Sequence, residues 1–151
     1  MTTIELSSTA FADGQAIPRR HSREGDEVSP PLTWSAPPDG TAELVLLCED
    51  PDAPSGTFLH WLVTGIAPDT AGLAEGGTAP GGEPRPNGFG DIGWGGPMPP
   101  TGHGPHRYFF RLYAVSEPLP LPGRAKTEDV HRALEGRKLA EGTLMGTYER
   151  R

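Results

Sequence analysis

The chain has 151 residues, enough to bury a single core, and a formal net charge of −7, which argues against nucleic acid as a main partner because phosphate backbones attract basic surfaces. Its one cysteine excludes an internal disulfide and fits a reducing compartment, while no apolar run approaches the roughly 18 residues of a membrane span. From the length we expect one globular domain over residues 1–151. Because the start of the sequence lacks a basic, apolar leader, we expect the protein to be cytoplasmic and without stable membrane insertion.

Three β-favouring segments lie in the first half of the chain, at residues 32–35, 42–49 and 59–66. In the first of them, Trp34 is most simply a core aromatic. The second is almost continuously apolar, which is typical of a strand that is buried on both faces. Cys48 at its end is therefore predicted to be a small buried hydrophobe rather than a reactive nucleophile.

The loop that joins the two longer strands is rich in acids and prolines. Asp50 and Asp52 flank Pro51, and Pro54 follows. Proline fixes its own φ and keeps the preceding residue extended, so this loop should be stiff. It is predicted to hold two carboxylates at the strand ends, close to His60 near the start of the next strand.

Residues 68–104 show little periodicity of either kind, and a loop this long inside a compact domain tends to be functional or disordered. Two features favour order. Phe89 and Trp94 are expected to anchor the segment by burial, and the dipeptides Asn87-Gly88 and Gly90-Asp91 supply turns.

Residues 106–115 give the clearest strand pattern of the sequence. Alternation places His106 and Tyr108 on one face and Arg107 on the other. A sheet can bring His60 beside His106, so that two imidazoles and a phenol meet near glycine-rich backbone. These groups suit a small anion such as phosphate.

The C-terminal part of the chain is predicted to contain one helix and one strand. Thr127 begins the helix, and the acids of the first turn interact favourably with the positive end of the helix dipole. The apolar spacing of Val130 and Leu134 continues it to an end near Gly142, and residues 143–148 are expected to form a terminal strand.

Two motifs, in the order in which the family has them, resemble the phosphatidylethanolamine-binding protein family, also called Raf kinase inhibitor-like proteins. The resemblance is to the compact bacterial and archaeal form of that family. The motifs are Asp50-Pro51-Asp52-Ala53-Pro54 followed by His60-Trp61, and the run from Gly96 through Pro99-Pro100 and two more glycines to His106-Arg107-Tyr108. The resemblance implies a mainly β, sandwich-type fold with a large central antiparallel sheet, a smaller sheet and a few short peripheral helices. It also implies a homodimer.

The same resemblance implies a ligand site for phosphate-type anions, phosphorylated small molecules or phospholipid headgroups. Carried over by motif, its residues are Asp50, Asp52, His60, Pro100, His106 and Tyr108. We expect His60, His106 and Tyr108 to donate hydrogen bonds to the ligand. Asp50 is expected to orient an imidazole, and Pro100 to form a wall of the pocket. If imidazolium forms contribute, phosphate affinity should rise as the pH falls toward about 6.

The neighbouring polar residues are interpreted as structural. Arg107 points away from His106 and is expected to pair with a carboxylate such as Asp52, which would make Asp52 partly structural. His103 is expected only to line its loop. Its spacing of three from His106 suits metal binding on a helix but not on a loop, so we predict no metal and no cofactor.

Two other function classes stay open. A hydrolase could use Ser55 or a water activated by a His–Asp pair, but the sequence has no Gly-x-Ser-x-Gly elbow, so we predict no catalytic residue and a protein that is not an enzyme. Relatives of the family also include inhibitors, so a serine peptidase or a kinase could be a partner of the segment at residues 81–105.

Overall fold

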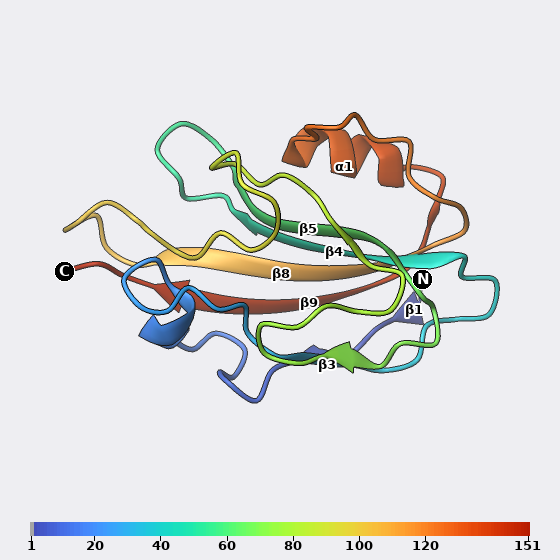
Figure 1. The fold of residues 1–151 in the computed structure, drawn as a ribbon, viewed down its shortest axis with the longest axis horizontal. Helices are drawn as coiled ribbons and strands as arrows, with labels where there is room; N and C mark the ends of the chain where they lie inside the picture. Colours follow the sequence, from blue (N-terminus) through green and yellow to red (C-terminus); the bar gives the residue numbers. More distant parts are fainter. Residues whose placement is uncertain (1) are drawn as a thin grey trace.

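The strongest β patterns of the sequence form the centre of a large sheet. The computed structural model describes residues 2–151 and places strands β4 (Glu43–Asp50), β5 (Phe58–Ile66) and β8 (His106–Val115) side by side, with β4 in the middle (Figure 1). Each lies within one residue of its predicted range, and β8 matches it at both ends. The apolar β4 is buried along almost its whole length, as the sequence predicted.

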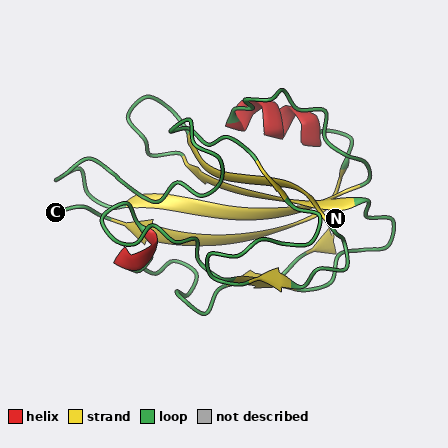
Figure 2. Ribbon diagram, in the orientation of Figure 1, coloured by secondary structure: helices red, strands yellow, loops and turns green. Residues whose placement is uncertain are grey.

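Two sheets make up most of the regular secondary structure (Figure 2). The six-stranded sheet has the order β1-β9-β8-β4-β5-β7 and is antiparallel except that β1 runs parallel to β9. The three-stranded sheet has the antiparallel order β2-β3-β6. The remaining elements are β1 (Thr2–Thr3), β2 (Leu6–Ser7), η1 (Arg19–His21), β3 (Leu32–Trp34), β6 (Gly72–Leu73), β7 (Glu83–Pro84), α1 (Thr127–Leu134) and β9 (Lys138–Tyr148).

The core consists of two layers of apolar side chains on opposite faces of the large sheet. The smaller sheet covers one face and α1 covers the other (Figure 1). Trp34 is buried in the layer between the sheets, as predicted, and its indole Nε1 donates to the carbonyl of Thr70 at 2.7 Å. Cys48 is also fully buried there.

The predicted end of the C-terminal helix is wrong. The helix begins at Thr127 as expected, but it ends at Leu134 and a turn follows, in which Gly136 has a φ of 77°. Residues 138–148 instead form β9, which pairs along all of β8. The buried positions of β9 alternate but include small residues such as Gly142, so the strand has little hydrophobic signal in the sequence.

The helical content of the molecule is small. The α-helix has eight residues, and no helix within residues 2–151 has the length and apolar character needed to cross a bilayer.

Candidate functional site

A β-bulge in β5 sets the direction of His60. Cys48 pairs with Trp61 and Glu49 pairs with Leu59, so His60 is an extra residue without a partner on β4. The bulge turns the chain so that Leu59 faces α1 whereas Trp61 packs on the other face of the sheet. His60 thereby lies beside the end of β4 and the start of β8, where it lines the same cavity as Asp50 and His106.

The ends of β4, β5 and β8 meet in a cavity of about 180 Å³. Asp50 ends β4 on the face of Cys48, and His106 and Tyr108 share the corresponding face of β8 by alternation. The structure therefore brings the two predicted histidines together although β4 separates their strands. The cavity is lined by Asp50, Ala53, Pro54, Ser55, Phe58, His60, Phe89, Met98, Pro99, Pro100, His106 and Tyr108.

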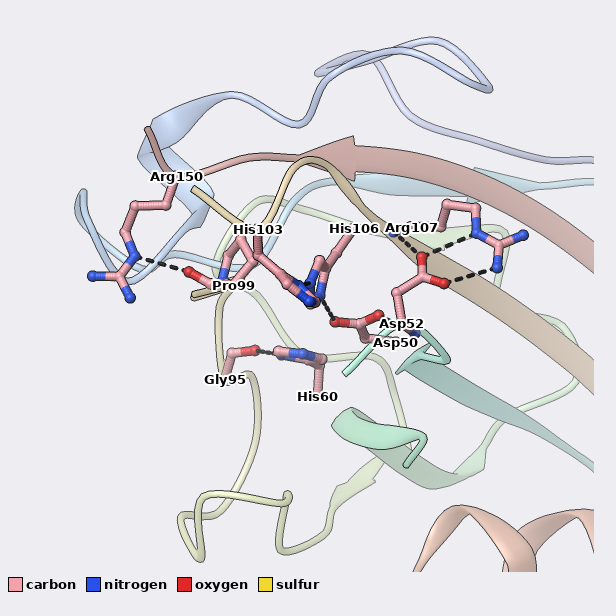
Figure 3. Close-up of polar contacts among 9 residues, drawn as sticks. All are labelled: Asp50, Asp52, His60, Gly95, Pro99, His103, His106, Arg107 and Arg150. Atoms are coloured by element: carbon pink, nitrogen blue, oxygen red, sulfur yellow. Dashed lines mark hydrogen bonds and ion pairs between the residues drawn. The ribbon is translucent and has the colours of Figure 1, made fainter. Parts of the chain in front are cut away.

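Asp50, His106 and His103 form a chain of hydrogen bonds, of which Asp50 and His106 line this cavity (Figure 3). The Oδ2 of Asp50 accepts from the Nδ1 of His106 at 2.7 Å, and its Oδ1 accepts the backbone N–H of Asp52 at 2.7 Å. The Nε2 of His106 lies 2.6 Å from the Nδ1 of His103. Both ring nitrogens of His106 are thus engaged, and Asp50 orients the ring as the sequence predicted.

His60 has a fixed tautomer. Its Nδ1 lies 2.7 Å from the carbonyl oxygen of Gly95, and because a carbonyl can only accept, this nitrogen carries the hydrogen (Figure 3). Burial of the ring lowers the pKa of His60 to about 4, so the ring is neutral at pH 6. Its Nε2 therefore offers a lone pair to the cavity, which differs from the expectation that His60 donates.

The other two predicted residues of the pocket lie where expected. Tyr108 is fully buried at the floor of the cavity, and burial, followed by the nearby charge of Asp50, raises the pKa of its phenol well above the ordinary value. The phenol thus keeps its hydrogen and can donate it. Pro100 contributes to the wall.

Asp52 does not line the cavity. Its two oxygens accept from the Nε and Nη2 of Arg107 at 3.0 and 2.8 Å, and one also accepts the Arg107 backbone N–H at 2.9 Å (Figure 3). The hydrogen bonds from this guanidinium lower the pKa of Asp52 to about 2. The expected Arg107 pairing is confirmed, and Asp52 holds the Asp-Pro loop against β8 instead of facing a ligand.

Replacing Arg107 is expected to return the pKa of Asp52 from about 2 toward its ordinary 3.8. Because the folded-state pKa is depressed, the pair stabilises the native protein above pH 3.8 and that contribution is lost as the pH falls toward 2. Arg107 is half-exposed, so Arg107→Ala should lower the free energy of unfolding only slightly. An NMR titration of the Asp52 carboxyl measures the shift; an unchanged pKa would show that Arg107 is not its cause.

Comparison with known proteins identifies the family. The model of the phosphatidylethanolamine-binding protein family matches residues 7–149. The chain belongs to this family. A UPF0098 protein of Methanothermobacter thermautotrophicus is 43% identical over 97% of this chain and 99% of its own length. The crystal structure of Escherichia coli YbcL, described as a member of the mammalian family, is 29% identical, covers 99% of this chain and 100% of its own, and superposes with a TM-score of 0.90.

Another relative bears on where the protein is located. LppC of Mycobacterium tuberculosis, named as a candidate lipoprotein, is 44% identical over 97% of this chain and 72% of its own length. The family therefore includes a protein with a different expected location, and the cytoplasmic location of the present chain stays a prediction.

In this family member the sequence interpretation missed two contributors to the site. His103 was expected only to line its loop, but it contacts His106 directly. Phe89 was expected to anchor the long loop by burial, yet it is 38% exposed and forms part of the cavity wall, whereas Trp94 packs against the core as predicted. The spacing of the two histidines was the available signal for the first contact.

The site has an incomplete donor set for a metal. Within residues 2–151 no three or more His, Cys, Asp or Glu side chains are grouped so that they could hold an ion. Both oxygens of Asp50 and the Nδ1 of His60 are also engaged by protein groups.

Proposed function

We propose that this protein is a non-enzymatic binder of a phosphate-type anion, with the cavity at Asp50, His60, His106 and Tyr108 as its site. One observation carries the proposal: two buried imidazoles from different strands open onto one small cavity, and their protein partners fix what each can offer. His60 offers a lone pair, and Tyr108 offers a hydrogen. His106 donates its Nδ1–H to the carboxylate of Asp50, so its Nε2 donates to a ligand only in the imidazolium form.

Phosphate matches this combination because at neutral pH it carries both a P–OH group and charged oxygens. The P–OH would donate to the Nε2 of His60, while charged oxygens would accept from Tyr108 and from His106. Sulfate has the same shape but no hydrogen to donate at neutral pH. It would leave the lone pair of His60 facing an oxygen, which is the kind of mismatch that buried polar sites reject.

Binding through His106 requires a local movement of His103. The Nε2 of His106 is engaged by His103 at 2.6 Å, so a ligand oxygen can accept from it only after His103 turns away. His103 lies between Gly102 and Gly104, whose φ angles are 75° and 85°. Glycine adopts such angles freely and can leave them freely, so the loop can change conformation without disturbing β8.

Isothermal titration calorimetry at neutral pH tests the proposal. Phosphate is expected to bind at least about tenfold more tightly than sulfate, and His106→Ala to weaken phosphate binding by about tenfold or more, since charge-assisted hydrogen bonds are lost. His131→Ala is the matched control, because His131 also lies 2.7 Å from a carboxylate, that of Glu49, but on α1. Equal phosphate affinity in His106→Ala and the wild type would reject this site.

The hydrolase alternative has one supporting observation, since Ser55 also lines the cavity. Asp50 contacts the Nδ1 of His106 as the carboxylate of a catalytic triad would, but the Nε2 that would take the serine proton contacts His103 in this structure. A homodimer and a peptidase or kinase partner at residues 81–105 stay predictions of the family resemblance, and a cytoplasmic location stays a prediction from composition.

A further inference from the structure

Two of the three large hydrophobic side chains that are exposed within residues 2–151 line the cavity. Within residues 2–151 the large hydrophobic side chains that are exposed are Phe89, Ile92 and Met98, at 38%, 66% and 40%. All three lie in one segment of ten residues. Phe89 and Met98 line the cavity, whereas Ile92 does not. Apolar surface that is exposed beside a polar site usually receives an apolar part of a partner or ligand.

Phe89 belongs to a row of aromatic rings that leads from the surface to the floor of the cavity. Its ring centroid lies 4.7 Å from that of Phe58 and 5.7 Å from that of His60. His60 in turn lies 5.1 Å from the buried Tyr108. A ligand whose anionic group reaches His60 would therefore place its next atoms against Phe89 and Phe58.

The exposed ring is held in place from several sides. The guanidinium carbon of Arg23 lies 4.0 Å from the centroid of Phe89, a cation–π contact. Asn87 fixes the backbone, since its Oδ1 accepts the N–H of Phe89 at 2.9 Å and its Nδ2 donates to the carbonyl of Gly93 at 2.9 Å. A ring that is fixed before binding loses little entropy when a ligand contacts it.

Glycines make room for both rings. A Cβ on Gly95 would lie 2.6 Å from Cδ2 of Phe89, and a Cβ on Gly88 would lie 2.6 Å from Cζ of Phe58. The backbone thus approaches the two rings more closely than any other residue would allow. Glycine at positions 88 and 95 thus fits the placement of both rings, although Phe89 remains exposed.

The cavity offers no free carboxylate to a cationic group. Asp50 is the single acid among the lining residues, and its two oxygens already accept from Asp52 and His106. The other acid of the loop, Asp52, is paired with Arg107. An ammonium group such as that of an ethanolamine headgroup would therefore have to share a carboxylate that already accepts two hydrogen bonds.

We infer that the preferred ligand is a small phosphate monoester whose substituent is apolar, with an aromatic or alkyl group packed against Phe89 and Met98. This inference rests on the proposed phosphate site and specifies its ligand class. The cavity of about 180 Å³ is smaller than the roughly 300–1,000 Å³ typical of drug-sized ligands, so the substituent is limited to about the size of one ring. The polar floor binds the phosphate, and the apolar rim selects the ester.

The test is calorimetric titration at about pH 6, where half of a phosphate monoester still carries a hydrogen. The probes are inorganic phosphate, phenyl phosphate and phosphorylethanolamine. Phenyl phosphate is expected to bind about tenfold more tightly than phosphorylethanolamine. Phe89→Ala and Met98→Ala should each weaken phenyl phosphate binding about fivefold and change inorganic phosphate binding by less than about twofold.

Ile92→Ala is the control, because Ile92 is the most exposed of the three side chains and does not line the cavity. It should bind all three probes as the wild type does. Binding of inorganic phosphate without a preference for phenyl phosphate would overturn the ligand class and leave the phosphate site intact. The same holds if Phe89→Ala and Ile92→Ala behave alike. Failure of all three probes to bind would overturn both the site and the ligand class.

Discussion

Lowering the pH from neutral to about 4 is expected to remove about 3 kcal/mol of folding free energy through His60 alone. Burial lowers the pKa of His60 to about 4 from 6.5. Between these values the unfolded chain binds a proton at this residue and the native protein does not, so stability falls as the pH falls. The contribution is fully present above pH 6.5 and is lost progressively down to about pH 4.

Urea unfolding of the wild type and of His60→Asn at several pH values isolates this effect. Asparagine retains an N–H that can donate to the carbonyl of Gly95, which accepts from Nδ1 of His60 at 2.7 Å, but it does not titrate. Subtracting the two curves removes the contributions of all other groups. The difference should grow by about 3 kcal/mol over the interval. Parallel curves would mean that His60 is as easily protonated in the native protein as in the unfolded chain.

The strands of the site could be predicted because their local sequence and their environment agree. β4 is apolar from Leu44 to Cys48 and buried on both faces, and β8 alternates in a way that puts His106 and Tyr108 on one face. The Asp-Pro loop is stiff for reasons visible in its composition, and Asp50 and Asp52 both find partners there. These features depend on residues close together in the chain.

The features that the sequence did not reveal depend on long-range contacts. The bulge at His60 arises from the pairing of β5 with β4, and no single strand pattern contains that register. β9 was mistaken in part for a helix because Gly142 and Gly146 fill its buried positions, where pairing with β8 decides the structure. The contact between His103 and His106 depends on a loop whose path is set by glycines.

Asp50→Ala is expected to lower the free energy of unfolding by about 3 kcal/mol and to abolish phosphate binding. Asp50 is 3% exposed and accepts two hydrogen bonds, one from the backbone of Asp52 that closes the loop and one from His106. Removing the carboxylate would leave the ring of His106, which is 2% exposed, without the partner that orients it. A buried polar group that loses its partner costs more than the bond alone contributed.

The chain provides a matched control for this experiment in the preceding residue. Glu49 also contacts a histidine at 2.7 Å, but the side chain of His131 is 45% exposed and can turn to water. Glu49→Ala should therefore cost about 1 kcal/mol and leave phosphate binding unchanged, since Glu49 lies on the opposite face of β4 from the cavity. Urea unfolding and phosphate titration of both variants give the comparison. Equal losses in Asp50→Ala and Glu49→Ala would show that burial of the Asp50–His106 pair is not what makes it important, because burial of the histidine is the main difference between the two pairs.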